Sequence, residues 1–494
     1  MVLLFATVGG LAIAASFLRF SLWPVAWIAF VPILVAVFQC DDARNAAIIG
    51  FVAGLATNVP AFYWLVDTIH RFGGFPLWLS AFFYAVLSAF SALQFVLFAV
   101  ALRRVGPGPL AIVPACLWVA LELWFPNLFP WRLANSQRDV TALLQIGEVT
   151  GPYGLSFVMM WAAGAVALAV TRGVARARPG LAGSLIAVAA VVIFGVARLG
   201  AIDRWIEAAP EVRIGIVQGN LAVQEKNDVH YFETNSATYR ELTAGLGDDV
   251  DVVIWPESAI TEPIPRTLTQ LPPSFVNLLG IRSPLLTGAL TYGGTPEAPQ
   301  YYNSIVGIDA GGKVLGVSDK IILMPFGEYM PLGSVLPFLK RLSPMTGDFA
   351  AGIDVVPLDV PDVGRFAPLN CYEDLLAPIA RRAMQTSDSE VLFAVANDAW
   401  FGPTASPYQH EALALWRAIE NRRHLVRVTN TGVSDVIDPA GRVLLRLPMF
   451  EPAARVVGVR KLHGTTFYTR FGDVFAWLAT FVSVAALVTG GRRR

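Results

Sequence analysis

The chain has 494 residues, of which 55% are hydrophobic and only 15% are charged. Soluble globular proteins carry about 25% charged residues, so long membrane-spanning runs are the simplest explanation of the shortfall. Lysine and arginine total 37, as do aspartate and glutamate, which leaves no net charge. We therefore expect no nucleic-acid partner, because nucleic-acid binding requires a basic face.

The cysteines and histidines predict neither a disulfide framework nor a metal site. The three cysteines are Cys40, Cys116 and Cys371, an odd number, and two of them lie in or beside apolar runs. A set of paired disulfides is therefore not expected. No two of the five histidines stand at metal-ligand spacing, so we expect no metal and no cofactor.

Roughly eight apolar runs approach the length of about 20 residues that a membrane span requires. They cover residues 2–17, 22–38, 46–65, 77–101, 110–125, 155–170, 181–196 and 474–488. The first lacks a basic leading region and is followed at once by another, so we interpret it as a retained span. This pattern predicts a multi-pass α-helical membrane domain over residues 1–200, with about seven helices, and a C-terminal helix over 472–490.

Arginine placement predicts the orientation of these spans. With a cytoplasmic N-terminus, the cytoplasmic connections and tail contain Arg44, Arg103, Arg104, Arg172, Arg176, Arg178 and Arg492 to Arg494. The opposite short loops contain only Arg19, Arg71, Arg132 and Arg138, while Arg198 and Arg204 run against the trend. The excess predicts that the segment between the seventh and eighth spans lies outside the cytoplasm.

That segment, residues 211–461, alternates short β-branched runs with polar stretches. Continuous apolar runs of this length are typical of strands buried on both faces. The predicted strands cover residues 212–217, 252–255, 285–290, 304–308, 366–369, 391–396 and 425–429, and a helix is predicted over 409–423. Mixed strands and helices over this length predict one layered α/β domain.

Three short stretches in this segment contain reactive side chains. Trp255-Pro256-Glu257-Ser258 follows a strand that we expect Pro256 to end, which would leave Glu257 at the strand's carboxyl end. Taken alone, Glu257 is better explained as a solvated loop carboxylate.

The second stretch runs from Ser318 to Pro331 and contains Lys320 and Glu328 on either side of an apolar run. Each of these charges either lies at the rim of a buried region or belongs to a paired site.

The third stretch is Leu369-Asn370-Cys371-Tyr372-Glu373-Asp374, where a strand leads into Cys371 and a helix is expected over residues 375–385. A helix N-terminus lowers the pKa of a nearby thiol, so we expect a lowered pKa for a cysteine at this strand-to-helix turn. The alternative is a buried, inert cysteine.

Together the three stretches supply a full set of roles for acyl transfer through a thioester. A thiol needs a base to become a good nucleophile, and a buried carboxylate can act as that base. A lysine can stabilise the tetrahedral oxyanion. Sequence spacing alone leaves open whether Glu257, Lys320 and Cys371 converge.

The order WPES, DKxxLxPFGEYxP and NCYED resembles the nitrilase, or carbon–nitrogen hydrolase, superfamily. With the flanking spans, the whole chain is similar to the apolipoprotein N-acyltransferase family within it. Four further stretches fit that family: Val217 to Asn220 (VQGN), Tyr302 to Ser304, Asn397 to Gly402 (NDAWFG) and Asn430 to Gly432. In the membrane half, Phe129-Pro130-Trp131 followed by Ser136-Gln137 fits as well.

The resemblance implies a nitrilase-like α-β-β-α sandwich and a role for each matching residue. Glu257 is then the general base, Lys320 stabilises the tetrahedral intermediate, and Cys371 accepts the acyl group. Glu328 positions the lysine, while Tyr372 and Glu373 match residues that the family needs after its nucleophile.

The resemblance also implies the reaction and its setting. A phospholipid gives an acyl chain to Cys371, and the N-terminal amine of a diacylglyceryl apolipoprotein then accepts it. The enzyme would be a monomer in the bacterial inner membrane with its catalytic domain on the periplasmic side. The competing readings are a membrane-tethered amidase that uses water as acceptor and a catalytically silent lipid-binding protein.

Two positions depart from the family pattern. Asn227 follows Lys226 where relatives often carry an aromatic residue, and no glycine precedes Ser136-Gln137. These departures concern substrate contacts and leave the three predicted catalytic residues unchanged.

Overall fold

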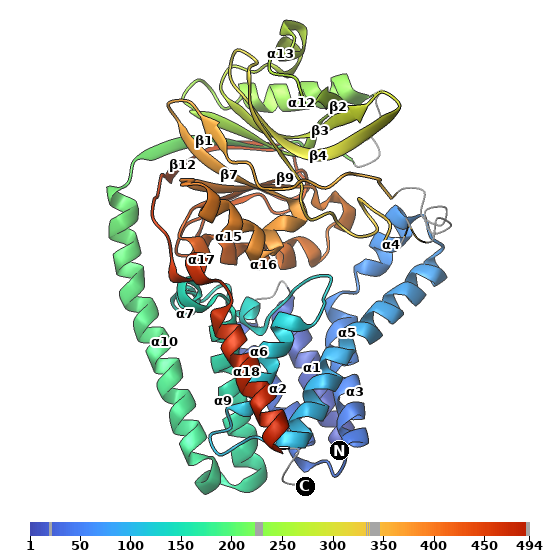
Figure 1. Cartoon of the computed structure of the whole chain (residues 1–494), viewed down its shortest axis with the longest axis vertical. Helices are drawn as coiled ribbons and strands as arrows, with labels where there is room; N and C mark the ends of the chain where they lie inside the picture. Colours follow the sequence, from blue (N-terminus) through green and yellow to red (C-terminus); the bar gives the residue numbers. More distant parts are fainter. Residues whose placement is uncertain (19–21, 223–230, 332, 334, 336–345, 491–494) are drawn as a thin grey trace.

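A computed structural model describes residues 1–18, 22–222, 231–331, 333, 335 and 346–490. A bundle of helices lies beneath an α/β domain, and both termini lie at the end of the bundle that faces away from that domain (Figure 1). Asn227, one of the two positions that depart from the family pattern, falls outside the described residues.

Each predicted apolar run forms a helix. The bundle consists of α1 (Val2–Phe17), α2 (Trp23–Gln39), α3 (Ala43–Ala61), α4 (Leu65–Gly73), α5 (Leu77–Val105), α6 (Val113–Trp124), α9 (Tyr153–Arg172), α10 (Val174–Ala208) and α18 (Val474–Gly490). Short helices η1 (Leu133–Gln137), α7 (Thr141–Leu144) and α8 (Gly147–Thr150) connect α6 to α9.

Among the described residues, α5, α9 and α10 are long and apolar enough to cross a membrane. Helix α3 and residues 65–71 of α4 meet that standard together but are bent by 58°. Helices α1, α2, α6 and α18 are apolar but shorter. The number of spans therefore stays a prediction.

Two helix ends differ from the sequence expectation. The run predicted over 46–65 breaks after Ala61, next to Pro60, which has no N–H to give to the last helical turn. The run predicted over 181–196 continues to Ala208, because charged residues can extend a helix beyond an apolar layer without ending it. Arg198 and Arg204, which opposed the orientation rule, lie on this extension.

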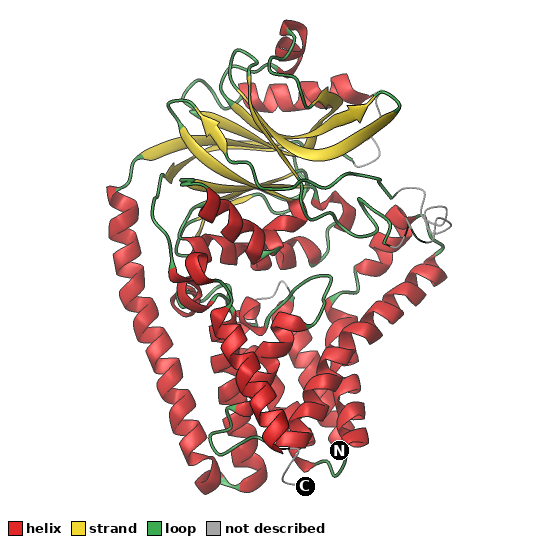
Figure 2. Ribbon diagram, in the orientation of Figure 1, coloured by secondary structure: helices red, strands yellow, loops and turns green. Residues whose placement is uncertain are grey.

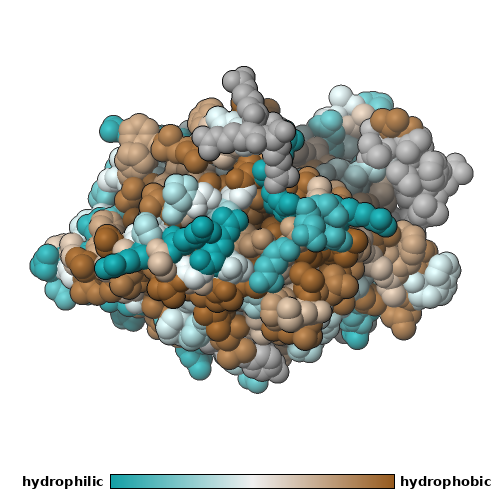
Figure 3. Space-filling model, turned by 90° about the horizontal axis from the view of Figure 1, so that it is seen from below, coloured by the Kyte–Doolittle hydropathy of each residue, from teal (hydrophilic) through white to brown (hydrophobic). Residues whose placement is uncertain are grey.

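The bundle is tightly packed inside and apolar outside. A Cβ on Gly50 of α3 would lie 2.5 Å from the carbonyl oxygen of Phe95 on α5, so these two helices touch backbone to backbone. Outward-facing Trp78, Ile186 and Phe481 are 72%, 69% and 64% exposed. This outward apolar surface suits contact with lipid. The end of the bundle away from the α/β domain is mixed, with hydrophilic side chains across its middle and hydrophobic ones around them (Figure 3).

The α/β domain contains two six-stranded sheets, ordered β12-β1-β2-β3-β4-β5 and β11-β10-β9-β8-β7-β6. The central strands of each sheet, β1 to β3 and β7 to β9, are parallel, and the outer pairs are antiparallel. The strands are β1 (Glu211–Gln218), β2 (Val252–Pro265), β3 (Leu285–Thr295), β4 (Ala298–Ile308), β5 (Val314–Asp319), β6 (Leu358–Val360), β7 (Gly364–Asn370), β8 (Val391–Ala396), β9 (Leu425–Thr429), β10 (Asp435–Ile437), β11 (Val443–Arg446) and β12 (Ala453–Arg460).

Helices cover both outer faces and complete an α-β-β-α sandwich (Figure 2). Helices α12 (Phe232–Ala244) and α13 (Pro273–Leu279) cover the first sheet, while α15 (Ala377–Thr386) and α16 (Ser406–Asn421) lie between the second sheet and the bundle (Figure 1). Trp416 of α16 belongs to the same hydrophobic cluster as Leu144 and Trp131 of the helical half. The two halves therefore share one continuous core.

The strand that carries Glu257 does not end at Pro256, as the sequence predicted. Strand β2 runs on to Pro265, but its parallel pairing with β3 is interrupted between Trp255 and Ile260. A proline is tolerated within a strand at such a bulge because no ladder hydrogen bond is required there. The predicted break in pairing is thus present, although the strand resumes beyond it.

Candidate active site

The structure brings Glu257, Lys320 and Cys371 together between the two sheets' carboxyl ends. Lys320 Nζ lies 3.4 Å from Glu257 Oε1, and the charges on both residues affect the pKa of the Cys371 thiol. The three stretches singled out in the sequence therefore converge in space.

Glu257 lies on the bulge of β2 and is only 6% exposed. Ser258, next along the chain, has a φ of 49°, which turns the backbone sharply at this point. A Cβ on Gly288 of β3 would lie 2.5 Å from the Glu257 Cα, so the neighbouring strand must carry glycine here. The close approach fixes the backbone that carries the carboxylate.

Asn303 of β4 links the two carboxylates of the site. Its Nδ2 donates to Glu257 Oε1 at 2.8 Å and to Glu328 Oε1 at 2.7 Å. Its carbonyl oxygen accepts from the Lys320 N–H at 2.8 Å, and its Oδ1 accepts from Asn370 Nδ2 at 3.1 Å. One asparagine thus touches the base, the lysine backbone and the residue before the cysteine.

Lys320 is buried and ion-paired with both carboxylates. Its Nζ lies 2.8 Å from Glu328 Oε2, closer than to Glu257. Burial alone would lower the lysine pKa, but Glu328 and Glu257 outweigh it and hold the pKa well above its usual value. The ammonium group is therefore permanently charged at physiological pH and ready to face a developing oxyanion.

Cys371 follows β7 with a φ of 51°, an uncommon backbone conformation for a residue with a side chain. The helix expected over residues 375–385 is present as α15 (Ala377–Thr386), and a 3₁₀ turn, η3 (Cys371–Leu375), separates it from the end of β7. Strained backbone of this kind is typical of functional sites, where the surrounding structure fixes the position of a side chain.

The predicted lowering of the thiol pKa is wrong. Burial and the negative charge of Glu257 raise the pKa of Cys371 well above its usual value, and Lys320 only partly offsets them. The Cys371 thiol is therefore neutral at rest and keeps its proton until a base removes it. The Glu257 carboxylate can accept that proton.

Glu373 ties the lysine segment to the cysteine segment. Its Oε1 accepts from the N–H groups of Ile321 and Ile322 at 2.6 and 3.2 Å, and its Oε2 accepts from the Asn370 N–H at 2.9 Å. Burial raises the pKa of Glu373, while these N–H donors favour its ionised form. Glu373 is therefore a positioning residue that fixes the distance between Lys320 and Cys371.

We expect Glu373→Gln to lower kcat about 10- to 100-fold while KM changes little. The amide turns one acceptor oxygen into a donor that faces backbone N–H groups, at a cost of about 1–3 kcal/mol in stability. Steady-state kinetics and thermal unfolding measure both effects. Glu262→Gln, on the exposed part of β2, is the matched control, and equal kinetics in the two variants would contradict the assigned role.

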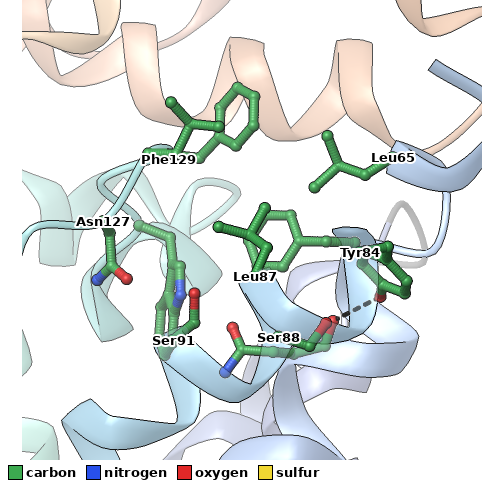
Figure 4. A pocket seen from close by; sticks show the side chains of 11 residues that line it. Leu65, Tyr84, Leu87, Ser88, Ser91, Asn127 and Phe129 are labelled. Carbon is green, nitrogen blue, oxygen red and sulfur yellow. Dashed lines mark hydrogen bonds between the residues drawn. The ribbon is translucent and has the colours of Figure 1, made fainter. Parts of the chain in front are cut away.

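Tyr372 connects the cysteine turn to the helical bundle. Its hydroxyl donates to the Leu128 carbonyl at 2.5 Å, in the loop after α6. Leu128 also lines a pocket between α3, α4, α5 and that loop, together with Leu65, Tyr84, Leu87 and Phe129 (Figure 4). This apolar pocket with polar edges therefore lies directly beneath the residue that follows the nucleophile.

A network of buried charged side chains contacts the turn η3, which begins with Cys371, through Asp374. His410 of α16 bonds Asp374 Oδ1 through Nε2 at 2.7 Å and Asp398 Oδ1 through Nδ1 at 2.9 Å. Arg427 of β9 bonds Asp374 Oδ2 at 3.1 Å. Asp374 belongs to the turn of Cys371, and Asp398 begins the turn η4 (Asp398–Phe401).

This network predicts a loss of stability at high pH. Burial opposes protonation of His410, but Asp374 and Asp398 outweigh it and raise its pKa from 6.5 to about 9. A raised pKa stabilises the fold fully below about pH 6.5, and the contribution, on the order of 3 kcal/mol, is lost as pH rises through 9. The melting temperature should therefore fall over that range. The fall should be absent in His410→Gln and retained in His70→Gln, which alters an exposed histidine; a similar fall in both would contradict the assignment.

Sequence reasoning missed Asn303 and Asn370 as parts of the site. Both stood inside quoted family stretches, Tyr302 to Ser304 and Asn370-Cys371. Their contacts depend on three strands meeting, which no local pattern shows. Within the described residues, no group of three His, Cys, Asp or Glu side chains is placed to hold a metal ion.

Comparison with known proteins gives the family. Residues 9–165 match the apolipoprotein N-acyltransferase N-terminal domain, and residues 213–457 match the carbon-nitrogen hydrolase domain. An apolipoprotein N-acyltransferase of Geobacter metallireducens is 34% identical over 98% of this chain and 94% of its own length. The chain belongs to the apolipoprotein N-acyltransferase family.

Further relatives agree with that assignment. The apolipoprotein N-acyltransferase of Azotobacter vinelandii is 33% identical over 92% of this chain and 88% of its own length. Among solved structures, Saccharomyces cerevisiae Nit3, a member of branch 10 of the nitrilase superfamily, aligns with a TM-score of 0.38 and 15% identity. That alignment covers 51% of this chain and 90% of the yeast protein.

Proposed function

We propose that this protein transfers an acyl chain from a membrane phospholipid to the N-terminal amine of S-diacylglyceryl-cysteine in bacterial lipoproteins. The observation that carries the proposal is the buried Glu257–Lys320–Cys371 cluster, held above an apolar helical bundle. A soluble substrate needs no such bundle, whereas two substrates anchored in a bilayer do.

The first half-reaction forms a thioester on Cys371. Glu257 accepts the thiol proton as the sulfur attacks the carbonyl carbon of the sn-1 ester of the phospholipid. The oxyanion that forms lies against the Lys320 ammonium group, whose positive charge is secured by Glu328. The intermediate collapses, the lysophospholipid alkoxide leaves with the proton from Glu257, and the acyl group stays on sulfur.

The second half-reaction transfers the acyl group to nitrogen. The α-amino group has an unperturbed pKa near 8, so a modest fraction is neutral at pH 7. It attacks the thioester and gives its surplus proton to Glu257, and the Cys371 sulfur leaves and is reprotonated by Glu257. One site thus serves donor and acceptor in turn, which makes the scheme ping-pong.

The helical half would place this chemistry at a membrane. Exposed apolar side chains on the bundle, among them Trp78, Ile186 and Phe481, are suited to contact with acyl chains. We propose that the bundle spans the inner membrane with the catalytic domain on the periplasmic side. The shared core between the two halves fits a monomer, which needs no second chain to seat the domain.

The test is to incubate the purified full-length protein with phospholipid alone and record its intact mass. We expect one added acyl group, mapped by peptide analysis to the segment with Cys371. A diacylglyceryl peptide should then remove it and become N-acylated. Discharge by water only would favour an amidase-type hydrolase, and absence of any adduct would remove Cys371 as the lipid-accepting nucleophile.

A further inference from the structure

A second cavity lies away from the candidate active site, where the catalytic domain meets α8 and α10. It measures about 370 Å³, within the range of small-molecule sites. Its lining comes from α8, α10, the end of α16 and the loop 463–467. Helix α16 carries His410 near its start and leads to this cavity, about 18 Å further along its axis.

The charged lining of the cavity is mainly cationic. Arg198, Arg422 and Arg423 face it, against the single carboxylate of Glu148. Arg422 and Arg198 both bond Glu148, at 2.7 and 2.6 Å, so that carboxylate is already neutralised. His463, also in the lining, lies 3.2 Å from Asp388 and 3.3 Å from Glu390.

The two buried arginines share little negative charge, because Glu148 pairs with both Arg422 and Arg198, while Arg423 donates to backbone carbonyls. Burial lowers the pKa of Arg423 to about 10, and its nearest carboxylate, Asp388, is 4.0 Å away. Burial also lowers the pKa of Arg422, and the ion pair with Glu148 only partly offsets this effect. A cavity lined in this way attracts an anion, which would relieve both effects.

Hydrogen-bond donors are available at the cavity. Arg198 uses its Nε for Glu148 and is 35% exposed, and neither of its Nη atoms has a partner within the described part of the chain. The backbone N–H groups of residues 463–466 likewise donate to no acceptor among the described residues. Guanidinium and backbone N–H groups are the usual ligands of a phosphate.

The cavity lies at the level where lipid headgroups would stand. Helices α9 and α18 begin at Tyr153 and Val474, immediately after α8 and the loop that line the cavity. Trp205 of α10 and Phe467, which is 49% exposed, complete the lining. Aromatic side chains of this kind are enriched at the boundary between hydrocarbon and water.

We propose that this cavity is a second ligand site, which takes the phosphate of a net-anionic phospholipid. The phosphate contacts the free edge of Arg198 and the N–H groups of the loop 463–466, and the acyl chains extend along α10 into the membrane. Because the lining joins bundle and catalytic domain, the bound lipid would strengthen their attachment. The site is separate from acyl transfer and does not depend on it.

The test compares the thermal stability of the full-length protein in nanodiscs of phosphatidylcholine with and without phosphatidylglycerol. A third arm adds inorganic phosphate to the phosphatidylcholine sample, and native mass spectrometry counts retained phosphatidylglycerol. The variants are Arg198→Gln and its matched control Arg204→Gln, an exposed arginine on the same helix that does not line the cavity.

We expect phosphatidylglycerol to raise the melting temperature by several degrees in the wild type and in Arg204→Gln. In Arg198→Gln this increment should shrink by at least half, with about fivefold less retained lipid. Because each protein is compared with itself, stability lost with the Glu148 ion pair does not affect the readout. An equal increment with inorganic phosphate alone would identify free phosphate as the ligand source. No increment in the wild type, or an undiminished one in Arg198→Gln, would overturn the proposal.

Discussion

Replacing Cys371 with alanine is expected to abolish the acyl-enzyme and to lower transfer roughly 10⁴-fold or more. The reason is chemical, because the scheme passes every acyl group through this sulfur, and removing a nucleophile costs far more than removing a residue that supports it. The fold should survive, because the side chain is small and partly exposed. Intact mass after incubation with phospholipid measures the adduct.

The other cysteines supply the controls for that experiment. Cys40 is also a partly exposed free thiol and Cys116 is buried in the bundle. Cys40→Ala and Cys116→Ala should both retain the adduct and the transfer rate. If an acyl group still appeared on Cys371→Ala, the carrier would lie elsewhere and the proposed chemistry would be wrong.

Replacing Lys320 with methionine is expected to lower acyl-enzyme formation about 10³-fold, the scale at which loss of an oxyanion contact acts. Methionine keeps the length of the side chain but removes the charge that two carboxylates surround. Glu257 and Glu328 would then face each other without a cation, at a cost of about 3–5 kcal/mol in stability. Single-turnover acylation and thermal unfolding measure the two effects.

Lys313→Met is the control for charge loss, because Lys313 is an exposed lysine seven positions earlier in the same domain. It should leave both quantities unchanged. The effect of Lys320→Met on acylation can be separated from misfolding by measurement below its melting temperature. An unaltered acylation rate in that folded variant would remove Lys320 from the site.

The sequence predicted which residues belong to the site, whereas their convergence and the details of each segment are visible only in the structure. The stretches around Glu257, Lys320 and Cys371 stood out because each places a reactive group beside an apolar run. The runs before Glu257 and Cys371 form the parallel strands β2 and β7, whereas the run after Lys320, which the structure describes in full, forms no strand. Glu373 was predicted to matter, but its role was not. Its three N–H partners belong to segments some fifty residues apart, and no local pattern reports such a contact.

Other misses have specific physical causes. Strands β6, β10 and β11 are three or four residues long, too short for an alternating pattern to register. Helix α10 continues past its apolar run because its last turns face a protein domain rather than lipid; there Asp203 pairs with Arg442 of the catalytic domain. The thiol pKa of Cys371 was misjudged because desolvation outweighs the nearby lysine, and sequence gives no measure of desolvation.

The chain enters and leaves the α/β domain through two short connections. In a bilayer these connections would fix the height of that domain above the membrane. Only Ala209 and Pro210 separate the end of α10 from β1, and thirteen residues separate the end of β12 from the start of α18. Because both connections are short, the domain cannot move far toward or away from the helical bundle. The enzyme would then select acceptors by the distance between the membrane and the group that reaches the active site. We expect the choice of acceptor to depend on the height of its first residue above its lipid anchor rather than on the sequence that follows.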